Sequence, residues 1–424
     1  MQLLRITDGT TTVTLSGDGG VILQASYVPS RGEPGGTVTE DAQVVLEGTA
    51  SQVQAKVRAV QQLFRTAARW QGSGRLERVY VEYQHEGDAS AWRAEVLDGG
   101  VEWVDDPMQR RFSASQAVGS VMIVSWTRRS EWEGASTALT WGAGAASTAS
   151  ITNGDGSPYN ATDVTSGSIA GELPAPIALR IKNSAGTDVA WREFHVANLG
   201  EAGFSTNQHI LTAATAASSW DPYSTHSNLR WICAVSSTVL AKCQGMPFRV
   251  IATLASASAG VYFRAAVYAN LDGAYQQLAY GPERYAGDIA AQLVLDLGVL
   301  PVPPGGEDSA TAGVAIVITA RHAAVGAATL DHVQLLPAAE YVRLEQTGFS
   351  AEANDELVLD EVQRRVYADD GTSHYNIALR RGAPLVVVPG RANRIAVLFR
   401  ESSGYTPGRA MTLSGSYRPR RLTL

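Results

Sequence analysis

Cysteine is almost absent from this sequence, since its 424 residues contain only Cys233 and Cys243. Two cysteines are too few for a scaffold that disulfide bonds hold together. We interpret them as reduced packing residues that flank a short run, and a bridge across a hairpin is the alternative. Lysine is also scarce. Nearly all basic residues are arginine, which we attribute to the codon bias of a GC-rich genome.

Long hydrophobic runs are missing as well. No segment approaches the roughly 20 apolar residues of a membrane-spanning helix. The opening residues, MQLLRITDGT, lack the charged and apolar regions of a secretory signal. We therefore expect no membrane insertion and no secretion signal. The formal net charge of −7 disfavours a nucleic-acid-binding surface, so we expect no nucleic-acid specificity.

Motifs that carry chemistry are absent. The sequence has no glycine-rich phosphate loop, no HExxH or CxxC pair and no nucleophile elbow, and its seven histidines lack metal-ligand spacing. Glu131 and Glu133 flank Trp132, and paired carboxylates can hydrolyse glycosides. Their position at a domain exit favours solvated charges instead. We expect no enzyme activity and no catalytic residue, metal or cofactor.

What the sequence does contain is a series of short strands. Hydrophobic residues make up 45% and charged residues 18%, which is typical of a globular chain with several cores. Short β-branched runs recur between glycine, proline, asparagine and aspartate, which indicates β-sandwiches. The expected fold class is therefore all-β, with two to four domains.

One segment has the period of a helix instead. In TASQVQAKVRAVQQLFRTAARW the apolar residues fall at helical spacing, and Thr49 and Gln52 have the spacing of a capping box. We predict a helix from about Ala50 to Trp70. Its buried stripe would consist of Val53, Val57, Val60, Phe64, Ala67 and Ala68.

Two glycine-containing stretches indicate turns. Asp98-Gly99-Gly100 interrupts an apolar segment, and we predict a hairpin turn there. In PLVVVPGRANRIAVLF, Pro389-Gly390 separates two apolar runs, and we predict a short corner between two late strands of a sandwich.

Aromatic residues cluster between residues 220 and 285. They are Trp220, Tyr223, Trp231, Tyr262, Tyr268, Tyr275, Tyr280 and Tyr285. Aromatic rings on the face or loops of a sandwich can stack on sugars, and core packing is the alternative. Trp220 and Tyr223 are the best candidates, because SSWDPYSTHSN is polar. The predicted glycan-binding residues are Trp220, Tyr223, Trp231 and Tyr275.

The order of the segments resembles that of a known family. The N-terminal series contains VVLEGTASQVQAKVRAVQQLF, VYVEY, WRAEVLDGGVEW and VSWTRRSEWEG. It resembles the N-terminal domain of distal tail proteins of the baseplate hub of long-tailed bacteriophages. ITNGDGS, GELPAPIALRIKN, DELVLDEVQRRVY and LVVVPGRANRIAVLF resemble the galectin-like C-terminal domain of that family.

The resemblance implies a domain organisation. Residues 1–135 would form a tail-ring β-sandwich with one helix, and residues 136–199 and 339–424 the two parts of a galectin-like β-sandwich. Residues 200–338 would form an inserted jelly roll similar to the carbohydrate-binding modules of larger family members. Such an insertion costs little, because loop-closure entropy grows slowly with loop length.

The resemblance also implies a function. The chain would be a structural virion protein of the tail tip, assembled in the host bacterial cytoplasm. A hexameric ring would join the tail tube protein to tail-tip and hub proteins, and the module would contact a host cell-surface polysaccharide. Two alternatives stay open: another tail component, such as a tube or adaptor protein, and a carbohydrate-active enzyme with accessory β-sandwiches.

Overall fold

The structure is a computed structural model in which β-strands dominate. It describes residues 3–16, 21–23, 27, 29–73, 78–104, 118–152, 161–200, 214–216, 229–235, 245–258, 260–271, 274–286, 293–301, 313–322, 328–346, 351–363, 365–369, 374–375, 378–401 and 409–424. Within these ranges there is one α-helix, and the strands pair antiparallel in several sheets. The expected all-β, sandwich-type fold is confirmed.

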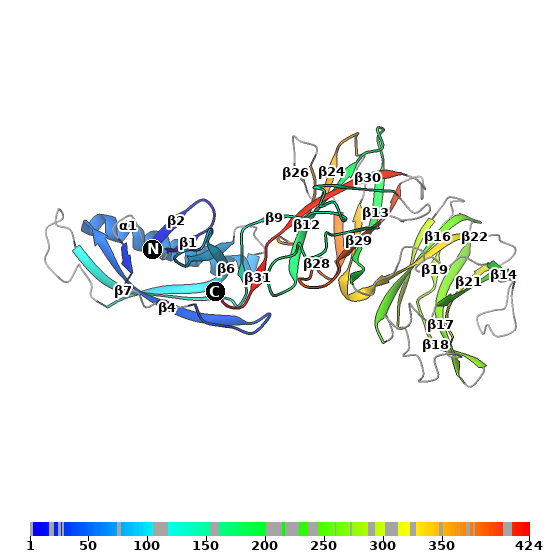
Figure 1. Cartoon of the computed structure of the whole chain (residues 1–424), viewed down its shortest axis with the longest axis horizontal. Helices are drawn as coiled ribbons and strands as arrows, with labels where there is room; N and C mark the ends of the chain where they lie inside the picture. The colour runs from blue at the N-terminus through cyan, green and yellow to red at the C-terminus, as the bar shows by residue number, and fades with distance from the viewer. Residues whose placement is uncertain are drawn as a thin grey trace. The chain divides into compact units, whose positions relative to one another are not determined.

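The chain divides into two compact units (Figure 1). Unit 1 consists of Met1–Thr137, Ala170–Ala175 and Arg418–Leu424, and unit 2 of Ala138–Ile169 and Pro176–Tyr417. Unit 1 is therefore built from three separate stretches of sequence, the last of which is the C-terminus.

A nine-stranded sheet forms the framework of the described part of unit 1. Its main path runs through β2 (Thr12–Ser16), β1 (Leu3–Thr7), β5 (Val79–Gln84), β6 (Trp92–Trp103), β7 (Val118–Arg129), β4 (Thr37–Gly48) and β3 (Val21–Leu23). β8 (Trp132–Glu133) pairs with β6, and β31 (Arg420–Arg421) pairs with β8. The end strands β2 and β3 approach each other, so the sheet curls around its core.

The predicted helix is present as α1 (Ala50–Ser73), which ends three residues later than expected. The capping box at its start is formed. The Thr49 N–H donates to Gln52 Oε1 at 2.8 Å, and the Gln52 N–H donates to Thr49 Oγ1 at 3.4 Å. These bonds satisfy donors that the first helical turn leaves without a partner.

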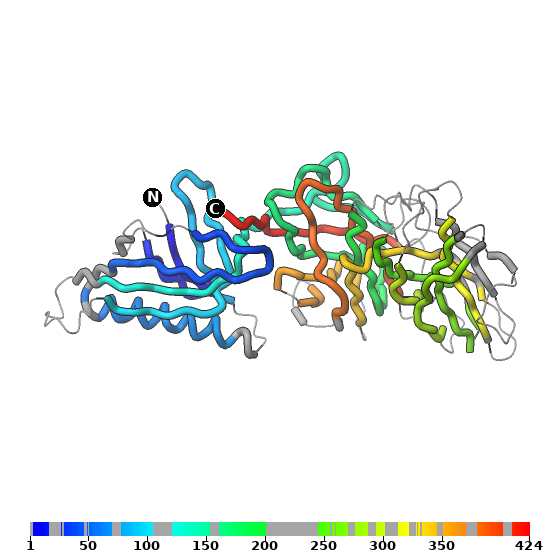
Figure 2. The backbone as a smooth tube through the Cα atoms, turned by 90° about the horizontal axis from the view of Figure 1, so that it is seen from below, coloured from blue at the N-terminus to red at the C-terminus, as the bar shows by residue number. Residues whose placement is uncertain are grey.

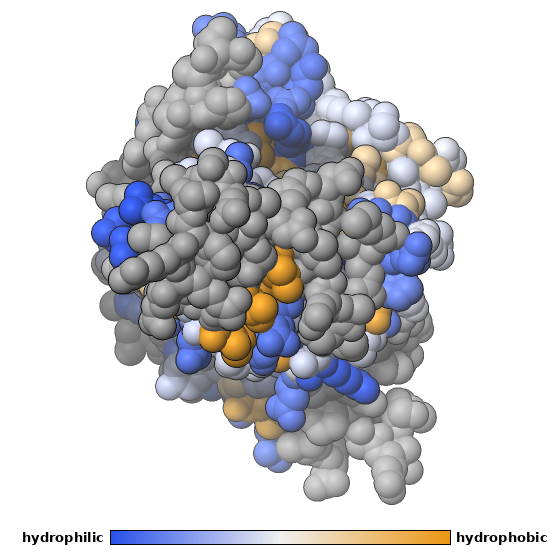
Figure 3. Space-filling view, turned by 90° about the vertical axis from the view of Figure 1, so that its left-hand side faces the viewer, coloured by the Kyte–Doolittle hydropathy of each residue, from blue (hydrophilic) through white to orange (hydrophobic). Residues whose placement is uncertain are grey.

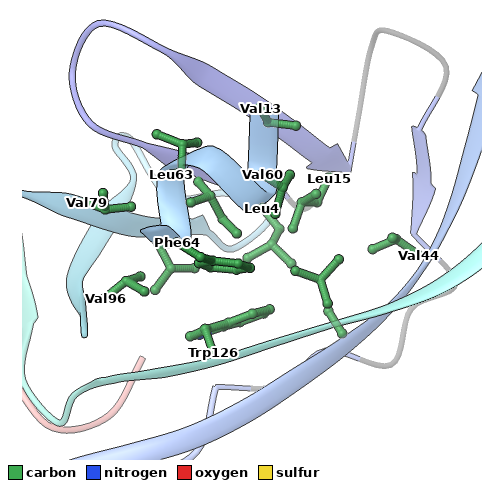
Figure 4. Close-up of a cluster of buried hydrophobic side chains, with 14 of the residues drawn as sticks. Leu4, Val13, Leu15, Val44, Val60, Leu63, Phe64, Val79, Val96 and Trp126 are labelled. Carbon is green, nitrogen blue, oxygen red and sulfur yellow. The ribbon is translucent and has the colours of Figure 1, made fainter. Parts of the chain in front are cut away.

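The buried stripe of α1 differs from the prediction at two positions. Ala68, at one edge of the stripe, is exposed, and Leu63, at the opposite edge, is buried in the core. Figure 4 shows the core that results, with Phe64 beside Trp126 and strand residues around them. The buried helix residues are Val53, Val57, Val60, Leu63, Phe64 and Ala67.

The predicted hairpin turn at Asp98-Gly99-Gly100 is wrong. β6 runs without a break from Trp92 to Trp103, and only its register with β7 shifts, between Val96 and Asp98. A Cβ added at Gly99 would lie 2.6 Å from ring carbons of Phe64. Gly99 therefore marks the close approach of a helix side chain to a strand, and not a turn.

A buried ion pair connects β4 and β7 to the segment before β4. Arg128 donates to both carboxylate oxygens of Glu40, at 2.8 and 2.6 Å, and also to Ser30 O at 2.8 Å. The Tyr27 hydroxyl donates to Glu40 Oε2 at 2.8 Å. Burial, together with the charge of Glu40, raises the pKa of Tyr27, so the phenol stays a donor. This set of bonds fixes the residues around Ser30 against the sheet.

A second ion pair brings the C-terminus into unit 1. Arg420 Nη2 lies 2.5 Å from Glu133 Oε1, and Arg93 Nη2 lies 3.3 Å from Glu133 Oε2. Burial opposes ionisation of Glu133, but the charge and hydrogen bond of Arg420, together with the charges of Arg93 and Arg418, outweigh it and lower the pKa of the carboxyl. Figure 2 shows this last segment of the chain in red.

Unit 2 contains two pairs of sheets in its described part. The first pair, the carrier sheets, has an eight-stranded and a five-stranded member. The eight-stranded sheet contains β10 (Ala149–Thr152), β30 (Ala410–Tyr417), β12 (Ala175–Asn183), β24 (Glu356–Asp360), β25 (Arg365–Asp369), β26 (His374–Tyr375), β28 (Val386–Val387) and β9 (Thr137–Ala138). The five-stranded sheet contains β11 (Ala161–Asp163), β29 (Arg394–Glu401), β13 (Trp191–Asn198), β23 (Tyr341–Gln346) and β27 (Ala378–Gly382).

The second pair, the module sheets, is formed by residues between 214 and 337. The six-stranded sheet contains β14 (Ala214–Ala216), β15 (Leu229–Val235), β21 (Val314–His322), β17 (Val261–Leu271), β18 (Ala274–Tyr280) and β19 (Arg284–Tyr285). The three-stranded sheet contains β20 (Leu293–Pro301), β16 (Pro247–Ala257) and β22 (Ala328–Pro337). Both sheets supply side chains to one core, so they form a sandwich. The boundaries of the inserted module stay a prediction.

The predicted Pro-Gly corner is confirmed. β28 lies in the eight-stranded and β29 in the five-stranded carrier sheet, so Pro389-Gly390 carries the chain from one sheet to the other. Gly390 has φ +73°, which suits glycine. Asn393 is buried, and its side chain bonds both the N–H and the C=O of Val388, at 2.8 and 2.9 Å.

An apolar seam joins the module sheets to the carrier sheets. Ile251, Val294 and Leu336 of the module belong to one buried cluster with residues of the carrier. The carrier residues of this seam are Ala161, Ala197, Leu199, Tyr341, Ala396 and Leu398. The module is therefore seated on its carrier by hydrophobic packing and is not merely tethered by two chain crossings.

Phe64→Ala should lower the free energy of unfolding of unit 1 by about 3–5 kcal/mol, because it removes a buried ring and leaves a cavity. Gly99→Ala should also destabilise, since its methyl group overlaps that ring. In the Phe64→Ala background the Gly99→Ala cost should largely disappear. Urea unfolding of the wild type, the two single variants and the double variant measures this coupling.

The exposed helix residue Arg65 supplies the control, and Arg65→Ala should change stability by no more than about 0.5 kcal/mol. Strictly additive costs for Phe64→Ala and Gly99→Ala would contradict the contact between them.

Candidate functional site

The four predicted glycan-binding residues are only partly covered by the structure. Trp220 and Tyr223 lie outside the described residues. The backbone of Trp231 lies in β15, opposite Ile318 of β21, and that of Tyr275 lies in β18, opposite Asn270 of β17. The side chains of these two also lie outside what the structure describes. Their role stays a prediction.

The described part of the module offers a different set of aromatic residues. Along β17, Phe263 and Ala265 are buried in the module core, whereas Tyr262 and Arg264 are only partly buried. Because successive side chains on a strand point to opposite faces, Tyr262 and Arg264 lie on the side of the six-stranded sheet that faces away from the core.

Neighbouring strands extend this row. Tyr285 of β19 is opposite Tyr262, and their ring centroids are 5.0 Å apart. The guanidinium of Arg321 lies 5.0 Å from the ring centre of Tyr262, and that of Arg264 lies 4.9 Å from the ring centre of Tyr280. Arg321 Nε also lies 2.6 Å from Glu283 Oε1. We name these six residues the aromatic face: Tyr262, Arg264, Tyr280, Glu283, Tyr285 and Arg321.

The aromatic face has the chemistry that sugar recognition requires. Tyr280 and Tyr285 are 63% and 44% exposed, so their rings are accessible to a ligand. A tyrosine ring can cover the apolar face of a sugar, while arginine and glutamate can bond its hydroxyls. Tyr268 differs, because it is buried and its hydroxyl donates to Gln277 Oε1 at 2.9 Å. It packs and does not form part of a binding surface.

A signal for the aromatic face is present in the sequence. Tyr262 and Arg264 alternate with the apolar Phe263 and Ala265, which is the pattern of a strand with one solvated face. The prediction named Tyr262, Tyr280 and Tyr285 in the aromatic cluster but did not select them as glycan-binding residues.

A buried network of charges lies on the five-stranded carrier sheet. Glu193 and His195 of β13 are both buried. Glu193 Oε1 lies 2.5 Å from Arg343 Nε and 3.2 Å from His195 Nε2, and Glu193 Oε2 lies 3.4 Å from Arg400 Nε. On its other side, His195 Nδ1 lies 2.6 Å from the hydroxyl of Tyr341.

These partners keep Glu193 ionised. Burial alone would raise the pKa of Glu193, but the hydrogen bond and charge of His195, together with the charges of Arg343 and Arg400, lower it to about 2. Burial raises the pKa of Tyr341, and the charge of Asp296 acts in the same direction. Tyr341 is therefore a neutral phenol beside His195 at neutral pH.

Asp296 of β20 extends the network into the module. Its Oδ2 lies 2.6 Å from Arg249 Nη1 and 3.9 Å from Arg343 Nη1, and its Oδ1 accepts from the N–H of Gly298 at 3.0 Å. Arg343 thus lies between a carboxylate of the carrier and one of the module. The network adds an electrostatic connection to the apolar seam.

A hollow of about 270 Å³ lies beside the network. The module contributes residues of β19 and β20, and the carrier contributes residues of β13, β23 and β29. The residues that line the hollow are Glu193, Arg284, Tyr285, Ala286, Val294, Leu295, Asp296, Arg343 and Arg400. Tyr285 belongs both to this hollow and to the aromatic face.

The interpretation of Glu131 and Glu133 as solvated charges is wrong for Glu133, which is buried, and both carboxylates have structural partners. Glu133 is paired with Arg420 and Arg93, and Glu131 Oε1 accepts from the N–H of Gly35 at 2.6 Å. In the described ranges no group of three or more histidine, cysteine, aspartate or glutamate residues is arranged to hold a metal ion. The one described α-helix is not apolar enough to cross a membrane.

No protein-family model and no curated protein matches the sequence. Solved structures to which the chain is similar include two of the phage p2 baseplate in its activated conformation, one with Sr and one with Ca. They align over 100% of both chains with 10% and 11% identity and TM-scores of 0.28 and 0.27. Another, of the infectious bursal disease virus VP2 subviral particle, has 8% identity and a TM-score of 0.16 over 68% of this chain and 82% of that one. TM-scores this low do not establish a shared fold.

The stability of unit 2 should fall in acid because of Glu193. Its pKa in the folded protein is about 2, below the ordinary value of 4.5. Ionised Glu193 therefore stabilises the fold fully above about pH 4.5, and this contribution is lost as the pH falls toward 2. The loss should be on the order of 3 kcal/mol, measured by urea unfolding between pH 7 and pH 2.5.

Glu193→Gln should be less stable at pH 7, because it leaves two arginines without their carboxylate. It should also show a shallower decline in acid. Glu352→Gln, at an exposed position, should keep the wild-type pH dependence. If the free energy of unfolding falls equally with pH in the wild type and in Glu193→Gln, another group causes the decline.

Proposed function

We propose that this chain is a structural protein of a bacteriophage tail tip. It would form a ring of the distal-tail type that joins the tail tube to tip and hub proteins, and its module would contact glycans on the host surface. The order of segments in the sequence supports this proposal. The phage p2 baseplate is an assembly of the same kind, but the weak structural similarity adds no weight.

The observation that carries the ring proposal is the uncovered face of the sheet in unit 1. α1 packs on one face, where Ala42 and Val44 of β4 are buried. On the opposite face Thr37, Thr39, Asp41 and Gln43 of β4 are exposed. A sheet with one covered face and, along β4, a row of exposed polar residues on the other face suits a subunit that lines the wall of a ring.

The exposed surface of unit 1 is mostly polar. In its described part the exposed large hydrophobic residues are Val104 and Leu424. Figure 3 shows one face of the molecule, on which hydrophobic residues lie in small groups between hydrophilic ones. Such a surface favours subunit contacts through strand edges and polar side chains over a broad apolar interface.

The aromatic face carries the glycan part of the proposal. It offers exposed rings and charged groups on one side of a rigid sheet, and the rest of the described module uses its aromatic residues for packing. Affinity per site would be low, since the face is open. A ring of six copies would compensate, because multivalency raises avidity by about 10²–10⁴ without new contacts.

The proposal includes no catalytic step. The buried carboxylates Glu133, Glu193 and Asp296 are each held by arginine, so they serve the fold. A carbohydrate-active enzyme with accessory sandwiches is the alternative from another class. Release of reducing ends from a bound polysaccharide would support that alternative.

Full-length protein at high concentration should form six-fold rings, because closed cyclic symmetry satisfies every heterologous interface. Negative-stain electron microscopy shows the symmetry, and analytical ultracentrifugation gives the mass. Only monomers and dimers in both measurements, for the purified protein and for protein extracted from virions, would rule out the ring.

Tyr280→Ala should weaken binding to bacterial surface polysaccharides without changing the thermal midpoint, because the ring is exposed. One lost stacking contact should lower single-site affinity about three- to tenfold, and adsorption of the ring to cells by more. A polysaccharide array measures the first effect. Val299→Ala, at an exposed position of β20 in the three-stranded module sheet, is the control and should bind as the wild type does. Equal binding by Tyr280→Ala and wild type would remove the aromatic face from the proposal.

A further inference from the structure

The hollow beside the buried network is lined by two chemically different kinds of residue. The apolar ones are Ala286, Val294 and Leu295, together with the half-exposed Tyr285. The charged ones are three arginines and two carboxylates. An apolar wall with a few polar groups is the usual composition of a small-ligand site.

The charges of the hollow do not cancel. Glu193 pairs with Arg343 and Arg400, and Asp296 pairs with Arg249. Arg343 also lies 3.1 Å from Glu345, which, like Arg249, is outside the hollow. Arg284 is exposed, and its Nε donates to the backbone oxygen of Asp296 at 3.0 Å. Among the described residues it forms no ion pair with a carboxylate. Within the described residues the hollow therefore presents one arginine, Arg284, that no carboxylate pairs with.

We propose that this hollow binds one acidic residue of a surface glycan, with Arg284 facing the anionic group and Tyr285 covering the apolar face of the sugar ring. This inference rests on the proposed function, because it names the class of glycan that the module recognises. It also places the ligand against both the module and the carrier, since Glu193, Arg343 and Arg400 close the hollow from the carrier side.

The size and the charge of the hollow set the class of ligand. About 270 Å³ is slightly below the range of pockets for drug-sized ligands, so it fits a single sugar residue. An arginine fork matches both carboxylate and phosphate. The anionic group can therefore be the carboxylate of an acidic sugar or a phosphodiester between sugar units.

Binding to three defined polymers tests the inference on the full-length protein. Polygalacturonate carries carboxylates, poly(glycerol phosphate) carries phosphodiesters, and dextran is neutral. The apparent Kd is measured by biolayer interferometry at low and at high salt. Wild-type protein should bind at least one acidic polymer, and added salt should weaken this binding.

Arg284→Gln should weaken binding of that acidic polymer about tenfold or more, because it removes a charge-assisted hydrogen bond. Arg284→Lys should retain part of the affinity, since it keeps the charge but loses the two-pronged fork. Arg65→Gln changes the net charge equally on the exposed side of α1 and should bind as the wild type does. Arg284→Met, which keeps the aliphatic stem, replaces Arg284→Gln if the latter does not fold.

The outcomes separate this inference from the proposed function. If Arg284→Gln and Arg284→Met bind acidic polymers as tightly as the wild-type protein does, the inference is overturned. The proposed function still stands in that case if Tyr280→Ala loses polysaccharide binding. An equal loss of acidic-polymer binding in Arg65→Gln also overturns the inference, since the net charge of the protein then explains the binding. No binding of wild-type protein to any of the three polymers or to the array overturns both. A loss confined to polygalacturonate or to poly(glycerol phosphate) supports the inference and identifies the anionic group.

Discussion

Pairing of buried carboxylates with arginine is the interaction on which both units depend. A buried charge is tolerated only when a partner compensates for its lost hydration. Glu40 meets Arg128, which is 88 residues away, and Glu133 meets Arg420, which is 287 residues away. Each pair therefore connects strands that lie far apart in the sequence. The planar fork of arginine suits this role, since it can bond two oxygens and keep further donors for backbone carbonyls, as Arg128 does.

The parts of the fold that the sequence predicts are those with local causes. α1 is readable because its apolar spacing and capping box lie within one segment, and the Pro-Gly corner is readable because proline and glycine restrict the backbone directly. Gly99 shows where such reasoning ends. Asp-Gly-Gly is typical of a turn, but here glycine is needed because Phe64 lies against it, and that contact depends on how the helix docks. The arginine content shows the same limit. Composition reveals many arginines, but no local pattern tells which one will meet Glu40 or Glu133.

The candidate site follows the same division. The alternation around Tyr262 and Arg264 is visible in the sequence, but its meaning depends on which face of β17 covers the core, and only the packed sandwich decides that. The hollow could not be predicted at all. Its walls come from β13, β19, β20, β23 and β29, and no periodicity or spacing connects Arg284 with Glu193. Sites built between sheets that are distant in sequence carry no sequence signature, in contrast to motifs in which a single loop holds every ligand.

The packing of the module on its carrier affects how several weak glycan-binding sites could act together. The seam around Ile251 and Leu336 and the ion pairs of Arg343 restrict rotation of the module on its carrier. A restricted module loses little further freedom on binding, so less of the contact energy is spent on ordering. In the proposed ring it would also hold every aromatic face at a fixed angle. Multivalent gain depends on geometry, because sites that cannot reach the ligand together contribute nothing. A module held in a fixed orientation therefore suits a dense, repeating surface polymer as its ligand better than a sparse receptor. The repeating units of such a polymer offer a matching epitope at whatever spacing the ring imposes.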